Sequence, residues 1–152
     1  MRTPENLRLE HQLCVALYNA SRAMTGCYRP LLEQIGLTYS QYTVMLVLWE
    51  HETITMGALG QALHLDSGTL SPLLKRLERA GLVSRQRGIA DERTLHITVT
   101  AQGQRLQEQA AVAQRTVEET TGLDGSALAA LRDQLGELTN RLWAAPAEPV
   151  SA

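Results

Sequence analysis

The sequence predicts a mainly α-helical protein with one small β-hairpin, and three observations lead to this fold class. Apolar residues recur at three- and four-residue steps along most of the chain, which is typical of amphipathic helices. The stretch 95–99 instead alternates apolar and polar side chains, as a half-buried strand does. Two short helices, a glycine stop and this hairpin follow one another within residues 55–100, so this segment is predicted to be a winged helix-turn-helix.

The N-terminal part, residues 5–30, is predicted to be a helix that takes part in dimerisation. Its apolar stripe consists of Leu9, Leu13, Ala16, Leu17 and Ala20. Cys14 lies at the edge of this stripe, so we expect its thiol to be partly buried between helices. A small buried hydrophobe is the commoner role of a lone cysteine.

The first helix of the helix-turn-helix is expected over Met56 to Leu63 and the second from about Ser67. The second carries an apolar stripe of Leu70, Leu73, Leu74, Leu77 and Ala80. Asp66 or Ser67 can cap its start, and Gly81 can adopt the left-handed conformation that ends it. Its opposite face carries Ser67, Thr69, Ser71, Lys75, Arg76 and Arg79. Hydroxyls suit base edges and cations suit phosphates, so this face is typical of a DNA-reading helix, although an ordinary solvated face carries the same residue types.

The hairpin begins at Leu82 and Val83 and returns through the alternating strand, in which Leu95, Ile97 and Val99 are the apolar residues. Its polar tip and flanks carry Arg85, Arg87, Asp91 and Arg93. An arginine on such a wing can enter the minor groove of DNA. Residues 55–100 hold six Lys or Arg against four Asp or Glu, although the whole chain has a net charge of -2. Cationic charge is therefore concentrated on this segment.

Residues 101–144 are predicted to be dimerisation helices. The last helix has a heptad-like seam of Leu128, Leu131, Leu135, Leu138 and Leu142, and the segment 101–121 offers Leu106, Ala110, Ala113 and Val117, with Thr100 as its cap. These helices could pack on each other within one chain. We instead expect a homodimer, because two recognition helices double the contact with DNA. The tail 145–152, which contains two prolines, is expected to be disordered.

Composition is typical of one domain, 1–152, with a single core: 44% of the 152 residues are hydrophobic. Charged residues interrupt the N-terminus, and no segment is long enough to span a bilayer, so a cytoplasmic protein without membrane contact is expected. The four histidines are scattered without metal-ligand spacing. We expect no metal, no cofactor and no catalytic residues.

The sequence resembles the MarR family of bacterial transcription regulators in four motifs. They are Leu59-Gly60, the stretch SGTLSPLLKRLE at residues 67–78, Ala80-Gly81-Leu82-Val83, and Asp91-Glu92-Arg93. The resemblance implies a repressor that binds double-stranded operator DNA. It also implies that Asp91 and Arg93 are wing residues, with the acid positioning the arginine that enters the minor groove.

A second set of motifs is similar to the organic-hydroperoxide-sensing, OhrR-like branch of that family. It comprises LEHQLC at residues 9–14, Ala16-Leu17-Tyr18, Tyr28, Leu37-Thr38-Tyr39, Gln41-Tyr42 and Val47-Leu48-Trp49. This resemblance implies that Cys14 is the peroxide-sensing thiolate and that Tyr28 and Tyr39 reach it, from the partner subunit. The reduced dimer would bind a palindromic operator and leave it when an organic hydroperoxide oxidises Cys14 to a sulfenic acid.

Cys27 is a possible second thiol. Within one helix it would lie about 20 Å from Cys14, beyond disulfide reach. Capture of oxidised Cys14 by a small cellular thiol is the default, and a bond to Cys27 of the other subunit stays open.

Three different functions compete with a redox-sensing repressor. One is a repressor released by a small aromatic ligand, with incidental cysteines. The second is a thiol peroxidase, which no Cys-x-x-Cys pair supports. The third is a helical adaptor, which leaves the cationic wing unexplained.

Overall fold

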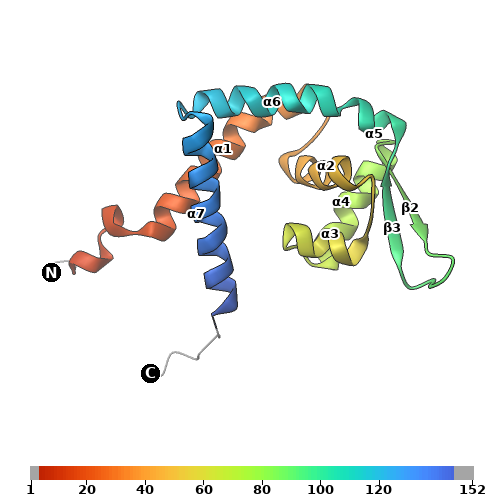
Figure 1. Ribbon diagram of the computed structural model, residues 1–152, viewed down its shortest axis with the longest axis horizontal. Coiled ribbons are helices and arrows are strands. Elements are labelled where there is room, and N and C mark those ends of the chain that lie inside the picture. The colour runs from red at the N-terminus through yellow and green to blue at the C-terminus, as the bar shows by residue number, and fades with distance from the viewer. Residues whose placement is uncertain (1–3, 146–152) are drawn as a thin grey trace. The chain divides into compact units, whose positions relative to one another are not determined.

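The computed structural model describes residues 4–145, which form two compact units divided after Gln114 (Figure 1). Of the tail predicted to be disordered, 145–152, all but Ala145 lies outside the described residues.

The first unit holds, in chain order, the short 3-10 helices η1 (Glu5–Leu7) and η2 (Leu9–His11), then α1 (Leu13–Glu33), α2 (Tyr39–His51), β1 (Thr53–Thr55), α3 (Met56–Leu63), α4 (Ser67–Arg79), β2 (Val83–Arg87), β3 (Leu95–Val99), α5 (Ala101–Arg105) and the first half of α6 (Gln107–Thr120). The second unit holds the rest of α6 and α7 (Gly125–Ala144). The predicted fold class, mainly helical with a small wing, is confirmed.

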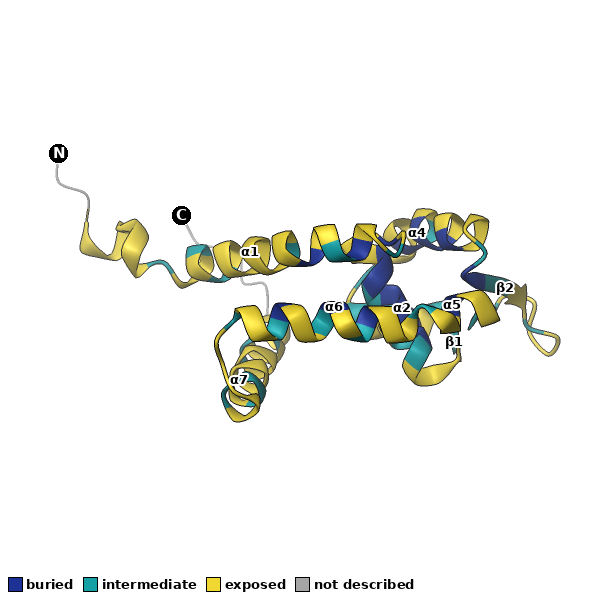
Figure 2. Cartoon of the chain, turned by 90° about the horizontal axis from the view of Figure 1, so that it is seen from above, coloured by how far each residue is buried: buried dark blue, intermediate teal, exposed yellow. Residues whose placement is uncertain are grey.

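Helix α2 lies at the centre of the first unit and packs against α1, α3, α4 and β3. Val44, Met45 and Leu48 on α2 are completely buried, and Figure 2 shows the dark blue of buried residues on α2 and α4. All four leucines predicted for the inner face of α4 are buried: Leu70, Leu73, Leu74 and Leu77. Each buried leucine stabilises the fold by roughly 1.5 to 3 kcal/mol relative to an exposed one.

The ends of the helix-turn-helix confirm the sequence signals. Asp66 caps α4, because its Oδ1 accepts a hydrogen bond from the Thr69 N–H at 2.7 Å. Gly81 follows α4 with a φ of 74°, the left-handed conformation that favours glycine. The turn between α3 and α4 contains His64, which has a φ of 54° although it is not a glycine.

The wing is a three-stranded antiparallel sheet with the order β1-β3-β2. Ile54 pairs with Ile97, and Arg85 pairs with Ile97 from the other side. The sequence did not predict the three-residue strand β1, which is too short to show a period. The predicted half-buried strand over 95–99 is β3, in which Ile97 is buried and Leu95 and Val99 are half-buried.

The N-terminal helix differs from its prediction. The run from Leu9 to Ala20 is not one helix, since η2 ends at His11 and Gln12 is extended, with φ −92° and ψ 105°. The Gln12 amide donates to the carbonyl oxygens of Asn6 and Arg8, at 2.6 and 3.1 Å, and so stabilises the break. Cys14 consequently lies in the first turn of α1.

The segment predicted to be one helix over 101–121 is broken at Leu106, between α5 and α6. Thr100 caps α5 as expected, because its Oγ1 accepts a hydrogen bond from the Gly103 N–H at 3.1 Å.

In the second unit, α7 forms the predicted helix, capped by Asp124. Its leucine seam is uncovered by its own chain: Leu131, Leu135 and Leu142 are exposed and Leu128 and Leu138 are half-buried. No helix within the described residues is both long enough and apolar enough to cross a membrane.

Candidate nucleic-acid interface and redox site

The outer face of α4 displays the polar side chains that the sequence assigns to DNA. Ser67, Thr69, Lys75, Arg76 and Arg79 are exposed, and Ser71 is half-buried. Among residues 4–145, no carboxylate lies within salt-bridge distance of Lys75, Arg76 or Arg79. These three cations are therefore available to phosphates.

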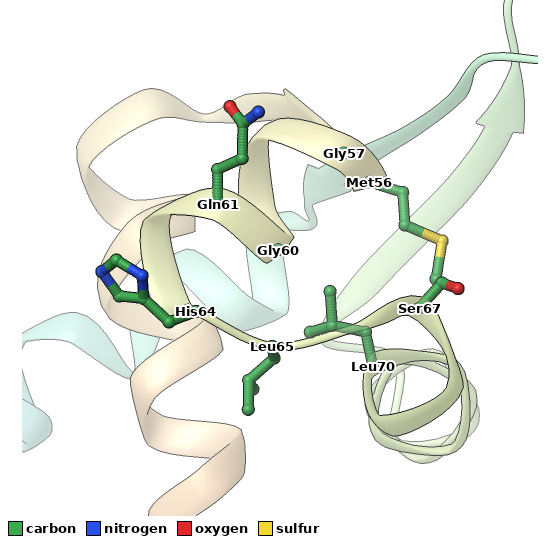
Figure 3. Close-up of a pocket in the computed structure, with 8 residues that line it drawn as sticks. All are labelled: Met56, Gly57, Gly60, Gln61, His64, Leu65, Ser67 and Leu70. Carbon is green, nitrogen blue, oxygen red and sulfur yellow. The ribbon is translucent and has the colours of Figure 1, made fainter. Parts of the chain in front are cut away.

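Helix α3 and the turn that leads into α4 approach each other closely at Gly60. A Cβ added at Gly60 would lie 2.7 Å from the carbonyl oxygen of Leu65, so only glycine allows this approach. A shallow cavity of about 350 Å³ lies between the two helices. Figure 3 shows that Met56 from α3 and Ser67 and Leu70 from α4 contribute to its lining. The turn between α3 and α4 therefore packs closely against α3.

The tip of the wing is organised by Asp91. Its Oδ1 accepts a hydrogen bond from the backbone N–H of Arg93 at 2.9 Å, and its Oδ2 accepts one from the Thr94 hydroxyl at 3.4 Å. Gly88 N–H donates to the Thr94 carbonyl at 2.8 Å and closes the loop. Asp91 therefore holds the backbone of Arg93 in place, and the side chain of Arg93 is exposed.

Arg87 and Arg85 differ from Arg93. Arg87 is exposed but donates to the carbonyl oxygen of Glu92 at 3.0 Å. Arg85 donates twice to the carboxylate of Glu78, from Nε at 2.8 Å and from Nη2 at 3.3 Å. These hydrogen bonds lower the pKa of Glu78 and raise the pKa of Arg85. The Arg85 guanidinium is therefore engaged with the protein and joins β2 to α4.

Both cysteines are free thiols on α1. Cys14 is exposed, so the partial burial expected for it is not provided by its own chain. Cys27 is exposed too. Because α1 is continuous from one to the other, their separation is about 20 Å, and a bond between them within one chain is excluded.

Four aromatic side chains form a second feature of the site, the aromatic cluster of Tyr28, Tyr39, Tyr42 and Trp49. Tyr28 and Tyr42 are buried, with ring centroids 5.2 Å apart. The cluster lines a cavity of about 550 Å³ together with Met24, Leu46, Glu50, Gln107, Ala110, Ala111 and Gln114. Tyr28 comes from α1 and the other three rings come from α2.

The structure brings Tyr28 and Tyr39 together, with ring centroids 5.7 Å apart, but not with Cys14 of the same chain. Tyr28 lies about 21 Å along α1 from Cys14, by the rise of the helix. Sequence reasoning did not assign Tyr42 or Trp49 to the cluster. The signal was available, since residues 39, 42 and 49 fall on one face of a helix. No group of three or more potential metal ligands was found in the part of the chain described.

Comparison with known sequences matches the chain to a family of transcriptional regulators described as SarA/Rot, over residues 27–110. The chain is also 44% identical, over 138 residues, to the organic hydroperoxide resistance transcriptional regulator of Bacillus subtilis. That match covers 91% of this chain and 94% of the relative.

Comparison of structures finds several forms of AbfR, a protein of Staphylococcus epidermidis. Reduced AbfR bound to DNA has a TM-score of 0.76 and 39% identity, and the match covers 93% of this chain and all of that one. Overoxidised AbfR bound to DNA has a TM-score of 0.72 and 38% identity, covering 91% and 97%. Disulfide-formed AbfR has a TM-score of 0.64 and 41% identity, covering 91% and 92%.

Proposed function

Because the chain belongs to the MarR family of transcriptional regulators, in the group that includes organic hydroperoxide resistance regulators, we propose that it is a redox-sensing repressor. The reduced protein binds operator DNA, and oxidation of Cys14 by an organic hydroperoxide releases it. The observation that carries this proposal is the coexistence, in one chain, of an exposed cationic face on α4 and an exposed thiol in the first turn of α1.

We assign the DNA contacts to two elements. The N-terminal hydroxyls of α4, on Ser67, Thr69 and Ser71, face base edges, and its cations contact phosphates. Arg93 and Arg87 at the wing enter or border the minor groove. Arg85 was expected to contact DNA directly. We assign it a different role, because it pairs with Glu78 and joins the wing to α4. AbfR, which has this fold, was solved bound to DNA in its reduced form.

We further propose that the working form is a homodimer built from residues 5–30 and 101–144. The single chain leaves large apolar side chains uncovered at both places. On the N-terminal part they are Leu7, Leu9, Leu13 and Met24, and on α7 they are Leu131, Leu135 and Leu142. A second copy of the chain could cover these surfaces in a symmetric dimer. Such a dimer would also present two recognition helices to two half-sites of the DNA. We also propose that residues 1–152 act as one domain. A protein that binds operator DNA would act in the cytoplasm.

The chemistry at Cys14 begins with its thiolate, which is the nucleophilic form of a cysteine side chain. The sulfur attacks the terminal oxygen of the hydroperoxide, so an S–O bond forms while the O–O bond breaks. The alkoxide leaves and takes up a proton to become the alcohol, and Cys14 becomes a sulfenic acid. In a dimer, Tyr28 and Tyr39 of the other subunit are the hydroxyl donors for this site, because those of the same chain lie too far away.

The sulfenic acid then condenses with a small cellular thiol, which forms a mixed disulfide and releases water. A bond to Cys27 of the other subunit is the alternative second step. Overoxidised AbfR was solved bound to DNA and a disulfide form was solved separately. We therefore assign release of this protein to the disulfide step, which adds bulk at Cys14, rather than to oxidation of sulfur alone.

The cavity beside the aromatic cluster supports a second candidate, a repressor released by a small aromatic ligand, with both cysteines incidental. The lining holds Glu50 but no Lys or Arg, so it offers no counter-charge to an aromatic carboxylate. A neutral aromatic or an alkyl chain suits this lining better. The same apolar lining is also compatible with the hydrocarbon part of a hydroperoxide, so the cavity does not favour the ligand-released repressor over the redox sensor.

A mobility shift on the DNA upstream of the protein's own gene tests the proposal. The reduced protein should shift this DNA with an affinity that falls as salt rises. Addition of an organic hydroperoxide with a small thiol should abolish the shift, and dithiothreitol should restore it. Release by a neutral aromatic compound, with Cys14 still reduced by mass spectrometry, would support the second candidate instead. Repeated turnover of hydroperoxide with excess thiol would indicate an enzyme.

A further inference from the structure

We propose that Trp49 is a positioning residue that couples the aromatic cluster to the DNA-reading part of the first unit. Its indole connects the cavity lined by tyrosines to the turn between α4 and β2. This inference rests on the proposed function and specifies how the redox site would regulate DNA binding. All of the residues concerned lie within the first unit.

One end of the connection is the stack of rings. Tyr42 lies between the other members of the aromatic cluster, with ring centroids 5.2 Å from Tyr28, 6.1 Å from Tyr39 and 6.4 Å from Trp49. Tilted aromatic pairs at such distances attract one another and move together in a packed interior. A rearrangement of Tyr28 or Tyr39 therefore reaches Trp49 through Tyr42.

The middle of the connection is a hydrogen bond between residues far apart in the sequence. The Trp49 Nε1–H donates to the carbonyl oxygen of Gly103 at 3.0 Å, in half-buried surroundings. Gly103 itself is buried, and a Cβ added there would collide with the carbonyl oxygen of Leu82 and lie 2.9 Å from Val99 Cγ2. Because there is no space at Gly103, a displacement of its backbone is passed to the base of the wing.

The far end of the connection is Thr100, which binds both sides of this junction. Its Oγ1 accepts from the Gly103 N–H at 3.1 Å and its hydroxyl donates to the Gly81 carbonyl at 2.6 Å. Its own N–H donates to the Leu82 carbonyl at 3.0 Å. Gly81 ends α4 and Leu82 leads into β2, so the path finishes between the recognition helix and the wing.

This path consists of ring contacts and hydrogen bonds that connect each residue to the next, and such a contiguous network can carry coupling between two sites. Its end point is suited to regulation, because DNA half-sites are spaced by one helical turn and a small shift of α4 weakens binding to both. The coupling itself is measurable as the ratio of DNA affinities in the reduced and oxidised states.

Trp49→Phe tests the proposal, because it keeps a ring in the aromatic cluster and removes the indole N–H. In the parent we expect oxidation to lower DNA affinity by about 5- to 150-fold. Loss of one hydrogen bond should reduce that ratio by about two- to tenfold. The rate of Cys14 oxidation, followed by mass spectrometry, should stay the same. A variant with the full parental ratio would overturn the proposal.

Trp143→Phe is the matched control, since it changes the other tryptophan of the chain, an exposed residue near the end of α7. We expect it to keep the parental ratio. It also leaves Trp49 as the one source of tryptophan fluorescence. The emission should change when Cys14 is oxidised and stay constant in the double variant with Cys14→Ser. Constant emission in both proteins would contradict coupling through Trp49.

Thr100→Val and Thr100→Ser test the end of the path at Thr100 independently. They also test the proposal if Trp49→Phe does not fold. Valine removes both side-chain hydrogen bonds and should reduce the affinity ratio, whereas serine should restore it. Equal ratios in the two variants would overturn the proposal. If the parent itself is not released by hydroperoxide together with a small thiol, the proposed function fails. If the parent is released and all variants match it, the role of Trp49 fails alone.

Discussion

The guanidinium of Arg85 holds the carboxylate of Glu78 by two hydrogen bonds, at 2.8 and 3.3 Å, and so ties the wing to the last turn of the recognition helix. The two elements that we propose to contact DNA, the wing and α4, are thereby joined to one another. The pair differs from a fully exposed salt bridge, because only about a fifth of the Arg85 side chain is accessible to solvent. Its loss should alter DNA binding without removing a contact to DNA.

Glu78→Gln should lower both DNA affinity and thermal stability, with a pH dependence that identifies the carboxylate. The hydrogen bonds from Arg85 depress the pKa of Glu78 in the folded protein, so the pair stabilises the fold above the ordinary pKa of glutamate. This stabilisation disappears as pH falls through the depressed pKa. The difference in Tm between parent and variant should thus be full at pH 7, shrink as pH falls below the ordinary pKa of glutamate, about 4.3, and vanish below the depressed pKa. A difference that is constant with pH would contradict this role.

Arg93→Ala should weaken DNA binding by about 1 to 3 kcal/mol at fixed salt, because it removes a groove contact. The fold should be unaffected, since the side chain is exposed. Asp91→Ala should also weaken binding, because the Arg93 N–H loses its acceptor, but it should add little in combination with Arg93→Ala. Fluorescence anisotropy with labelled operator gives these values. Full additivity of the two changes would mean that Asp91 does not act through Arg93.

Gly103→Ala should destabilise the protein by about 1 to 3 kcal/mol, because its Cβ would collide with the carbonyl oxygen of Leu82. Gly136→Ala is the matched control. Gly136 lies inside α7, off the leucine seam, and a Cβ there meets nothing within 4 Å. The control should stabilise the helix by roughly 0.5 to 1 kcal/mol. Urea unfolding distinguishes the two, and equal stability of both variants would refute the close approach at Gly103.

Sequence reasoning predicted those features that local chemistry determines. The apolar stripe of α4, the Asp66 cap and the left-handed Gly81 are set by residues within one or two helical turns. The bracing of Arg93 by Asp91 was implied by the family resemblance, and Asp91 does accept a hydrogen bond from the Arg93 N–H. The family resemblance, confirmed by the comparisons, added what periodicity does not contain: a role for Cys14.

Features set by distant residues were missed. Strand β1 exists because Thr53 to Thr55 pair with β3, some 45 residues away. The hydrogen bond from Trp49 to Gly103 joins residues 54 positions apart, and no local pattern predicts it. The break at Gln12 depends on which carbonyl groups its amide reaches. Likewise, the pairing of Arg85 with Glu78 required the geometry of two elements, so the sequence assigned Arg85 to DNA.

The central claim is that oxidation of Cys14 controls DNA binding, and a matched pair of cysteine variants tests it most directly. Operator affinity is measured for the parent, Cys14→Ser and Cys27→Ser, each before and after a stoichiometric organic hydroperoxide and a small thiol. Release of the parent and Cys27→Ser, with retention of DNA by Cys14→Ser, is the predicted result. Release of Cys14→Ser as readily as the parent would contradict the account.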